Sequence, residues 1–152
     1  MRSQACSAII LALVAFAIPA WASSPDEKPF DQNTIAALES RIGQASPRDQ
    51  CFLYAELIHQ MTEFSLKQYA AGDVDKASQL LRQVQQIVQK MQFSVADKNK
   101  RLKNAEILLR HSAFRLKEML RNSSSEDRPL VEATLAQVNQ AENETMMQVF
   151  RK

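Results

Sequence analysis

The sequence predicts an all-α protein, built as an antiparallel helical-hairpin bundle of four long helices plus a short N-terminal helix. Three observations support this fold class. The chain of 152 residues contains only two glycines. No segment shows the alternation of β-branched and polar residues that is typical of strands. Apolar residues recur instead at alternating intervals of three and four, which places them on one side of a helix and is typical of left-handed bundles.

The first 22 residues have the three parts of a secretory signal peptide. Arg2 supplies the positive charge, residues 8–18 form an uncharged apolar run, and Pro19 ends that run. Ala20 and Ala22 then place small residues at the two positions that a signal peptidase reads. Because the run is about half the length of a transmembrane helix, we expect cleavage after Ala22 and a periplasmic or secreted protein, from a bacterium. A retained membrane anchor or a buried core helix is the alternative.

The chain beyond the signal peptide has room for one domain. Residues 23–30 contain two prolines and three charged residues, which predicts a flexible leader, and residues 31–152 are expected to form a single helical-bundle domain. Without Arg2, the mature chain has 18 basic and 17 acidic residues. Such a balance predicts no general attraction to nucleic acid or to membranes.

The first two helices are predicted from their apolar spacing and their start signals. A short helix is expected over residues 31–44. Ser46 followed by Pro47 combines an N-cap hydroxyl with proline at the first helical position, and this second helix should run to Ala71. It is apolar over much of its circumference, so we place it in the middle of the bundle. The inward positions are Ile35, Leu38 and Ile42 in the first helix and Cys51, Tyr54, Ile58, Met61 and Ser65 in the second, with Leu53, Leu57 and Phe64 on one adjoining face and Phe52, His59 and Leu66 on another.

A tight turn is predicted where Gly72 ends the second helix and Asp73 caps the third. The third helix is the most clearly amphipathic one, with an outer face rich in glutamine. Its predicted inward positions are Ala77, Leu80, Leu81, Val84, Ile87, Val88 and Met91.

Two more helices complete the predicted bundle. Ser94 or Asp97 is expected to cap the fourth, which extends to about Arg121, and residues 122–127 form a polar loop before a last helix from near Arg128. The predicted inward positions are Leu102, Ala105, Leu109, Ala113, Leu116, Met119 and Leu120 in the fourth helix and Val131, Leu135, Val138, Thr145, Met146 and Val149 in the last.

The hairpin over residues 58–91 has a characteristic order of large, small, turn, alanine and apolar positions, namely Phe64, Ser65, Gly72, Asp73, Ala77, Leu81 and Val84. In this pattern it resembles a single tetratricopeptide repeat. The resemblance implies a helical hairpin that contributes to a groove for a protein partner, and no catalysis. Gln89 stands at the position of the family's proline, and residue 106, which is 34 residues beyond Gly72, lies within a predicted helix where a second repeat needs a turn. An ordinary helical hairpin is therefore the alternative interpretation.

Glu56-x-x-His59 is the one candidate for metal binding. This spacing places a carboxylate and an imidazole on one side of a helix, as in carboxylate-bridged di-iron bundles. Such bundles need a second pair, whereas Glu106 and His111 are five residues apart and point in different directions. We therefore favour an exposed glutamate beside a partly buried histidine and expect no cofactor.

Cys51 is the only cysteine of the mature chain, so no internal disulfide is expected. It lies one turn after the start of a helix, where the helix dipole can lower the pKa of a thiol and make it reactive. It also falls on an inward position, which opposes that effect. A buried, unreactive free thiol is the favoured interpretation, and an intermolecular disulfide or a redox role is the alternative.

The fourth predicted helix carries the leading candidate for an interaction surface. Residues 97–121 contain eight basic and three acidic residues. Basic residues mixed with exposed apolar ones would suit an anionic partner or an anionic surface. The favoured alternative is that Ile107 and Phe114 pack against the first or last helix, with Glu142 pairing with one of the bases. The candidate surface consists of Lys100, Lys103, Ile107, Arg110, Phe114, Lys117 and Arg121.

No enzyme motif is complete in this sequence. It lacks a nucleophile turn, a glycine-rich phosphate loop, a haem-attachment motif and His-Glu-x-x-His, and it has only two histidines. We therefore expect a non-enzymatic exported helical protein, a structural or interaction module that binds a protein partner or itself. The alternative is a metal- or cofactor-binding bundle that uses Glu56 and His59.

Overall fold

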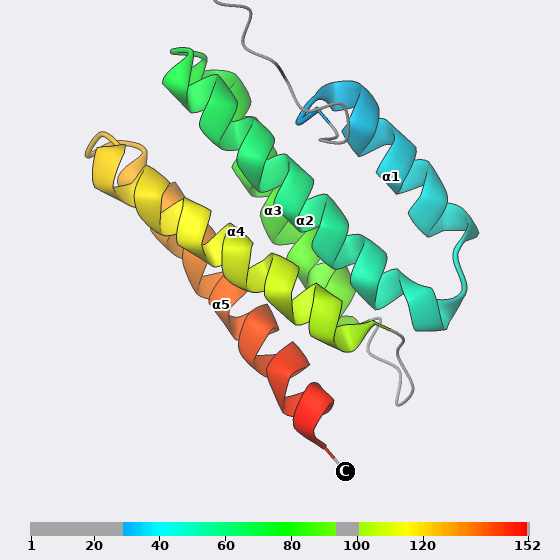
Figure 1. Cartoon of the computed structure of the whole chain (residues 1–152). Coiled ribbons are helices and arrows are strands. Elements are labelled where there is room, and N and C mark those ends of the chain that lie inside the picture. Colours follow the sequence, from blue (N-terminus) through cyan, green and yellow to red (C-terminus); the bar gives the residue numbers. More distant parts are fainter. Residues whose placement is uncertain (1–28, 94–100, 152) are drawn as a thin grey trace, which may run out of the picture.

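The computed structural model describes residues 29–93 and 101–151, and this part of the chain contains helices and no strand. It confirms the predicted all-α class and the order of five helices (Figure 1). The predicted signal peptide (1–22) and most of the predicted leader (23–30) lie outside the described residues. The helices are α1 (Gln32–Gln44), α2 (Pro47–Ala70), α3 (Val74–Phe93), α4 (Leu102–Asn122) and α5 (Arg128–Phe150).

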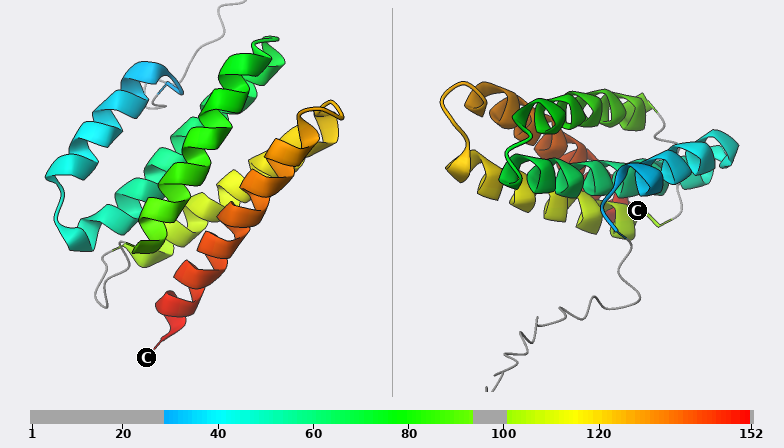
Figure 2. Two further views of the ribbon diagram at one scale, coloured as in Figure 1. Left: turned by 180° about the vertical axis from the view of Figure 1, so that it is seen from behind. Right: turned by 90° about the horizontal axis from the view of Figure 1, so that it is seen from above.

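The helices form two layers. The first layer contains α1, α2 and α4, and the second contains α3 and α5 (Figure 2). Within the described part of the chain, α2 packs against α1, α3 and α4, whereas α1 contacts no helix other than α2. The helix α5 packs against α3 and α4. This explains why α2 is apolar over so much of its circumference: three other helices pack against it, as its central position in the prediction requires.

The core consists largely of the predicted inward positions. The side chains of Leu57, Ile58 and Met61 on α2 are fully buried. Tyr54 and Leu66 are only half-buried and pack at the edge of the core. All seven predicted inward positions of α3 are buried, namely Ala77, Leu80, Leu81, Val84, Ile87, Val88 and Met91.

One predicted core position of α5 is wrong. Met146 is 37% exposed, whereas Ala141 and Thr134, which the sequence did not single out, are buried. Thr145 is buried as predicted, and the next residue along a helix points about 100° away. The buried stripe keeps an exact alternation of intervals of three and four, and Met146 lies outside it. The stripe consists of Val131, Thr134, Val138, Ala141 and Thr145.

The turn between α2 and α3 has the predicted chemistry. Gly72 adopts a left-handed conformation with φ of 85°. The backbone N–H of Lys76 donates to Oδ1 of Asp73 at 3.1 Å, so Asp73 caps α3. Across the hairpin, the hydroxyl of Ser65 donates to the carbonyl oxygen of Ala77 at 3.0 Å.

Replacing Gly72 with alanine should destabilise the protein by about 1–2 kcal/mol, because a left-handed conformation is costly for a residue with a Cβ. No atom lies within 4 Å of the added Cβ, so the effect is purely conformational. The matched control is Gly43→Ala inside α1, where space is equally open and alanine should stabilise by roughly 0.5–1 kcal/mol. Urea denaturation measures both values. Equal effects of the two substitutions would contradict the account of this turn.

Two helix starts differ from expectation. Ser46 precedes Pro47 as predicted, but its hydroxyl donates to the carboxylate of Asp49 at 2.7 Å and caps no backbone N–H. An ionised carboxylate is the stronger partner. The helix α4 begins at Leu102 after Arg101, a residue with φ of 60°, whereas the predicted caps at positions 94 and 97 lie outside the described residues.

Contacts at the ends of α2 fix the neighbouring segments. The guanidinium of Arg101 lies 3.5 Å from the ring centroid of Phe52, a cation–π contact that holds the start of α4 against α2. At the other end, the hydroxyl of Tyr69 donates to Oδ2 of Asp127 at 3.2 Å and accepts from the backbone N–H of Ser124 at 3.0 Å. Tyr69 thereby anchors the loop between α4 and α5.

Candidate functional site

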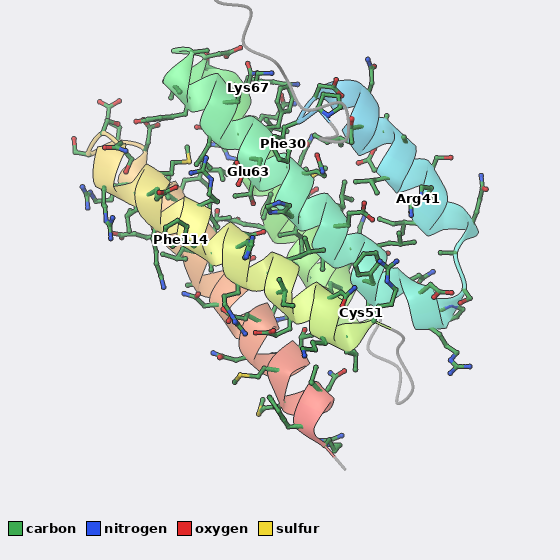
Figure 3. All side chains as sticks on the ribbon, in the orientation of Figure 1. Phe30, Arg41, Cys51, Glu63, Lys67 and Phe114 are labelled. Atoms are coloured by element: carbon green, nitrogen blue, oxygen red, sulfur yellow. The ribbon has the colours of Figure 1, made fainter. Side chains whose placement is uncertain are left out.

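The outer face of α4 presents the predicted basic and apolar side chains together. Ile107 is 39% exposed and Phe114, which is labelled in Figure 3, is 59% exposed. The favoured interpretation, in which these two side chains pack against the first or last helix, is therefore wrong. The reason is that α1 contacts only α2, while α5 packs on another side of α4. Lys100 lies outside the described residues, and the exposed bases of this face are Lys103, Arg110, Lys117 and Arg121.

One of these bases is held by carboxylates, as the sequence suggested for Glu142. Arg110 pairs with Glu106 one turn earlier, and its Nε lies 3.5 Å from Oε1 of Glu142 on α5. The hydrogen bond with Glu106 raises the pKa of Arg110 further above its ordinary value. Lys103 and Lys117 form no ion pair within the described ranges. The positive charge of this face therefore comes mainly from the lysines and from Arg121.

The end of α5 adds apolar side chains that the sequence reasoning missed. Met147 is 63% exposed and Phe150 is 74% exposed. Their exposure could have been predicted from the helical spacing, because neither residue falls on the buried stripe of α5. A groove of about 320 Å³ separates this end from α4 and is lined by Lys103, Glu106, Arg110, Met146, Val149 and Phe150. We call the outer side of α4 together with this groove the α4–α5 face, which consists of Lys103, Ile107, Arg110, Phe114, Lys117 and Arg121 with Met146 and Phe150.

A second surface lies where α2 meets α4. His59 is half-buried, and its ring forms edge-to-face contacts with Phe30 at 6.0 Å and with His111 at 6.3 Å between centroids. We expected Glu56 to be exposed beside His59, but its side chain is largely buried. Its Oε2 lies 3.7 Å from a guanidinium nitrogen of Arg41 on α1. An opening of about 450 Å³ adjoins His59 and also borders Phe52, Gln60, Arg101, Asn104, Ile107 and Leu108.

The pKa of His59 depends mainly on burial and on the carboxylate of Glu63, which Arg115 bridges to α4. Burial lowers the pKa of His59, the Glu63 carboxylate opposes this effect, and the charges of His111 and Arg115 add to it. Arg115 donates from Nε to Oε1 of Glu63 at 2.8 Å and also pairs with Glu118. The sequence did not predict this bridge between α4 and α2, because no local pattern reports which helices become neighbours.

Cys51 is buried, as the favoured interpretation predicts, and forms no disulfide. Burial raises the pKa of its thiol from 9.0 to about 11. The thiol is therefore protonated at neutral pH in the folded protein, although it lies near the start of α2. This environment is the opposite of that of a reactive cysteine.

The geometry thus defines an all-helical protein whose most distinctive surface combines basic and apolar side chains. Within residues 29–93 and 101–151, no three histidine, cysteine or carboxylate side chains gather as a metal cluster. No helix in those ranges is both long and apolar enough to span a membrane. No family model matches the chain, and no match was found among curated proteins or solved structures.

Proposed function

We propose that this chain is an exported, non-enzymatic helical protein that binds a protein partner through the α4–α5 face. The signal-peptide pattern of residues 1–22 supports export to the periplasm or the exterior. The partner is expected to present an amphipathic segment with apolar side chains flanked by acidic ones. Such a segment would place its apolar side chains against Phe114 and Phe150 and its carboxylates near Lys103 and Lys117.

The arrangement of the bundle is part of this proposal. We propose that α2, α3, α4 and α5 form an antiparallel four-helix bundle, with α1 as an addition on α2. The contacts of α2 with α3 and α4, and of α5 with the same two helices, support a closed ring of four. A closed ring buries one side of each helix and leaves the outer sides of α4 and α5 for binding.

The observation that carries the proposal is the exposure of large apolar side chains on neighbouring helices. Exposed apolar surface that is rimmed by polar residues often marks a protein-binding site, and the groove lined by Lys103, Arg110 and Phe150 joins the two helices here. Aromatic residues, methionine and arginine are also the residue types enriched in protein interfaces. Phe114, Met147 and Phe150 each expose more than half of their surface, and the exposed bases of α4 lie on the same side of that helix.

Replacing both Phe114 and Phe150 with serine should weaken binding of the partner by at least 10-fold, because truncated aromatic anchors typically cost more than about 1.4 kcal/mol. The mature protein would be used as bait with the exported fraction of the source cells, and the dissociation constant of the retained protein would then be measured. The free energy of unfolding should change little, since both side chains are exposed.

The matched control is Val74→Ser on α3, an exposed apolar position outside the α4–α5 face. Its binding should equal that of the unaltered protein. A charge-reversed variant, Lys103→Glu with Lys117→Glu, should also bind weakly, whereas Arg82→Glu on α3 should not. Unchanged binding by the double serine variant would overturn the proposal. Binding to vesicles with anionic lipids in place of a protein, or concentration-dependent dimerisation of the pure chain, would identify a different occupant of this face.

A further inference from the structure

The only two histidines of the chain are brought together by the fold. His59 on α2 and His111 on α4 are far apart in the sequence, and their ring centroids lie 6.3 Å apart. The two rings are inclined at 70°, and each is carried by a regular helix. The backbones that position them are therefore rigid, and only side-chain rotations separate the observed arrangement from other arrangements of the pair.

The ring nitrogens are available as ligands. Nδ1 of His59 is buried and has no hydrogen-bond partner within the described part of the chain. His111 is exposed to solvent. A neutral imidazole carries the lone pair that a metal ion requires.

The rings are near enough for a shared metal ion after a small side-chain movement. Bonds of about 2 Å from a metal to each nitrogen, at tetrahedral angles, place the two centroids roughly 5 Å apart. The observed 6.3 Å is longer than this, and rotation of the two side chains brings the rings closer. His59 lines an opening to solvent and His111 is exposed, so an ion can approach each of the two rings from outside.

Charged side chains of α1, α2 and α4 surround the pair. On α2, the carboxylates of Glu56 and Glu63 lie one turn before and one turn after His59, and both attract a cation electrostatically. Arg41 of α1 and Arg115 of α4 hold these two carboxylates through ion pairs. The protein therefore offers two nitrogen ligands and no carboxylate that is free of a basic partner.

We propose that His59 and His111 form a two-histidine binding site for a borderline divalent transition metal ion, such as Zn²⁺, Ni²⁺ or Cu²⁺, which links α2 to α4. Water molecules complete the coordination. Imidazole ligands select these ions over Mg²⁺ and Ca²⁺, which prefer oxygen. The ion binds the folded chain only, since unfolding separates the two histidines, and it therefore stabilises the fold.

The test uses the mature chain with a histidine-free affinity tag. At a Ni²⁺ or Zn²⁺ concentration 100-fold above the dissociation constant, Tm should rise by several degrees, on the order of 5–10 °C. Calorimetric titration should give one ion per chain. Mg²⁺ at the same concentration is the matched control ion and should leave Tm unchanged.

Two single variants decide the outcome. His111→Gln changes an exposed position and should fold normally, and His59→Gln removes the second ligand. Each should weaken binding of Ni²⁺ at least 10-fold and reduce the rise in Tm to half or less, whereas Cys51→Ala should retain the binding and the full rise. The site is supported if both histidine variants show this weaker Ni²⁺ binding and smaller rise in Tm while Cys51→Ala keeps both in full. An unaltered protein that binds no ion, or undiminished binding in His111→Gln, would overturn the inference.

Discussion

Replacing Leu109 with alanine is expected to lower the free energy of unfolding by about 2–5 kcal/mol. The Leu109 side chain is completely buried in the core between the two layers. Truncation removes its buried methyl groups and leaves a cavity that close-packed helices fill only in part. Chemical denaturation followed by far-UV circular dichroism measures this loss.

Ile107→Ala is the matched control for this substitution. Ile107 lies on the same helix, two residues earlier, and its side chain is substantially exposed. Its truncation should cost only about 1 kcal/mol, because 39% of the residue is already in solvent and truncation leaves no closed cavity. If Ile107→Ala were as costly as Leu109→Ala, Ile107 would belong to the core. The α4–α5 face would then lose one of its apolar members.

The second large effect concerns the thiol of Cys51. In the folded protein, this thiol should react with a bulky disulfide reagent at pH 8 at least roughly 100-fold more slowly than in the unfolded chain. The reason is that burial raises its pKa from 9.0 to about 11, so the reactive thiolate is correspondingly rare. Steric exclusion of the reagent from the core adds to this protection. The rate of labelling with and without urea is the measurement.

The same shift predicts how stability depends on pH. Because the pKa of Cys51 is raised in the folded state, the folded chain holds its proton more tightly than the unfolded chain does. Its contribution to stability is therefore complete below pH 9 and is lost as the pH rises through about 11. Cys51→Ala should remove this part of the alkaline destabilisation. Rapid labelling of Cys51 under native conditions would instead favour the redox or intermolecular-disulfide hypothesis.

Local patterns were sufficient to predict most of the fold. The start of α2 follows from proline at its first position, the start of α3 follows from its capping residue Asp73, and glycine at position 72 permits the left-handed turn between them. These features depend on neighbours within one turn of a helix, which the sequence displays directly. The position of α2 in the centre was also predictable, because apolar residues on several faces require several packing partners.

The candidate site was predicted only in part. The basic and apolar residues of α4 were identified from their spacing, but their exposure depends on where α1 and α5 pack. Met147 and Phe150 were missed because the prediction placed both Thr145 and Met146 inward. Only Thr145 lies on the buried stripe of α5, so the outward side of this helix was assigned wrongly near its end. Small and polar residues such as Thr134 occupy that stripe, and their burial is not evident from hydrophobicity alone.

The sequence by itself determined the helical class, most of the helix boundaries and most of the inward residues, since these depend on periodicity and capping within single segments. The tertiary structure alone decided which helices became neighbours. It brought His59 against His111, joined Arg115 to Glu63, and left Phe114 uncovered. The physical reason is that an apolar stripe specifies that a helix must be covered, whereas the partner that covers it is selected by the packing of the whole chain.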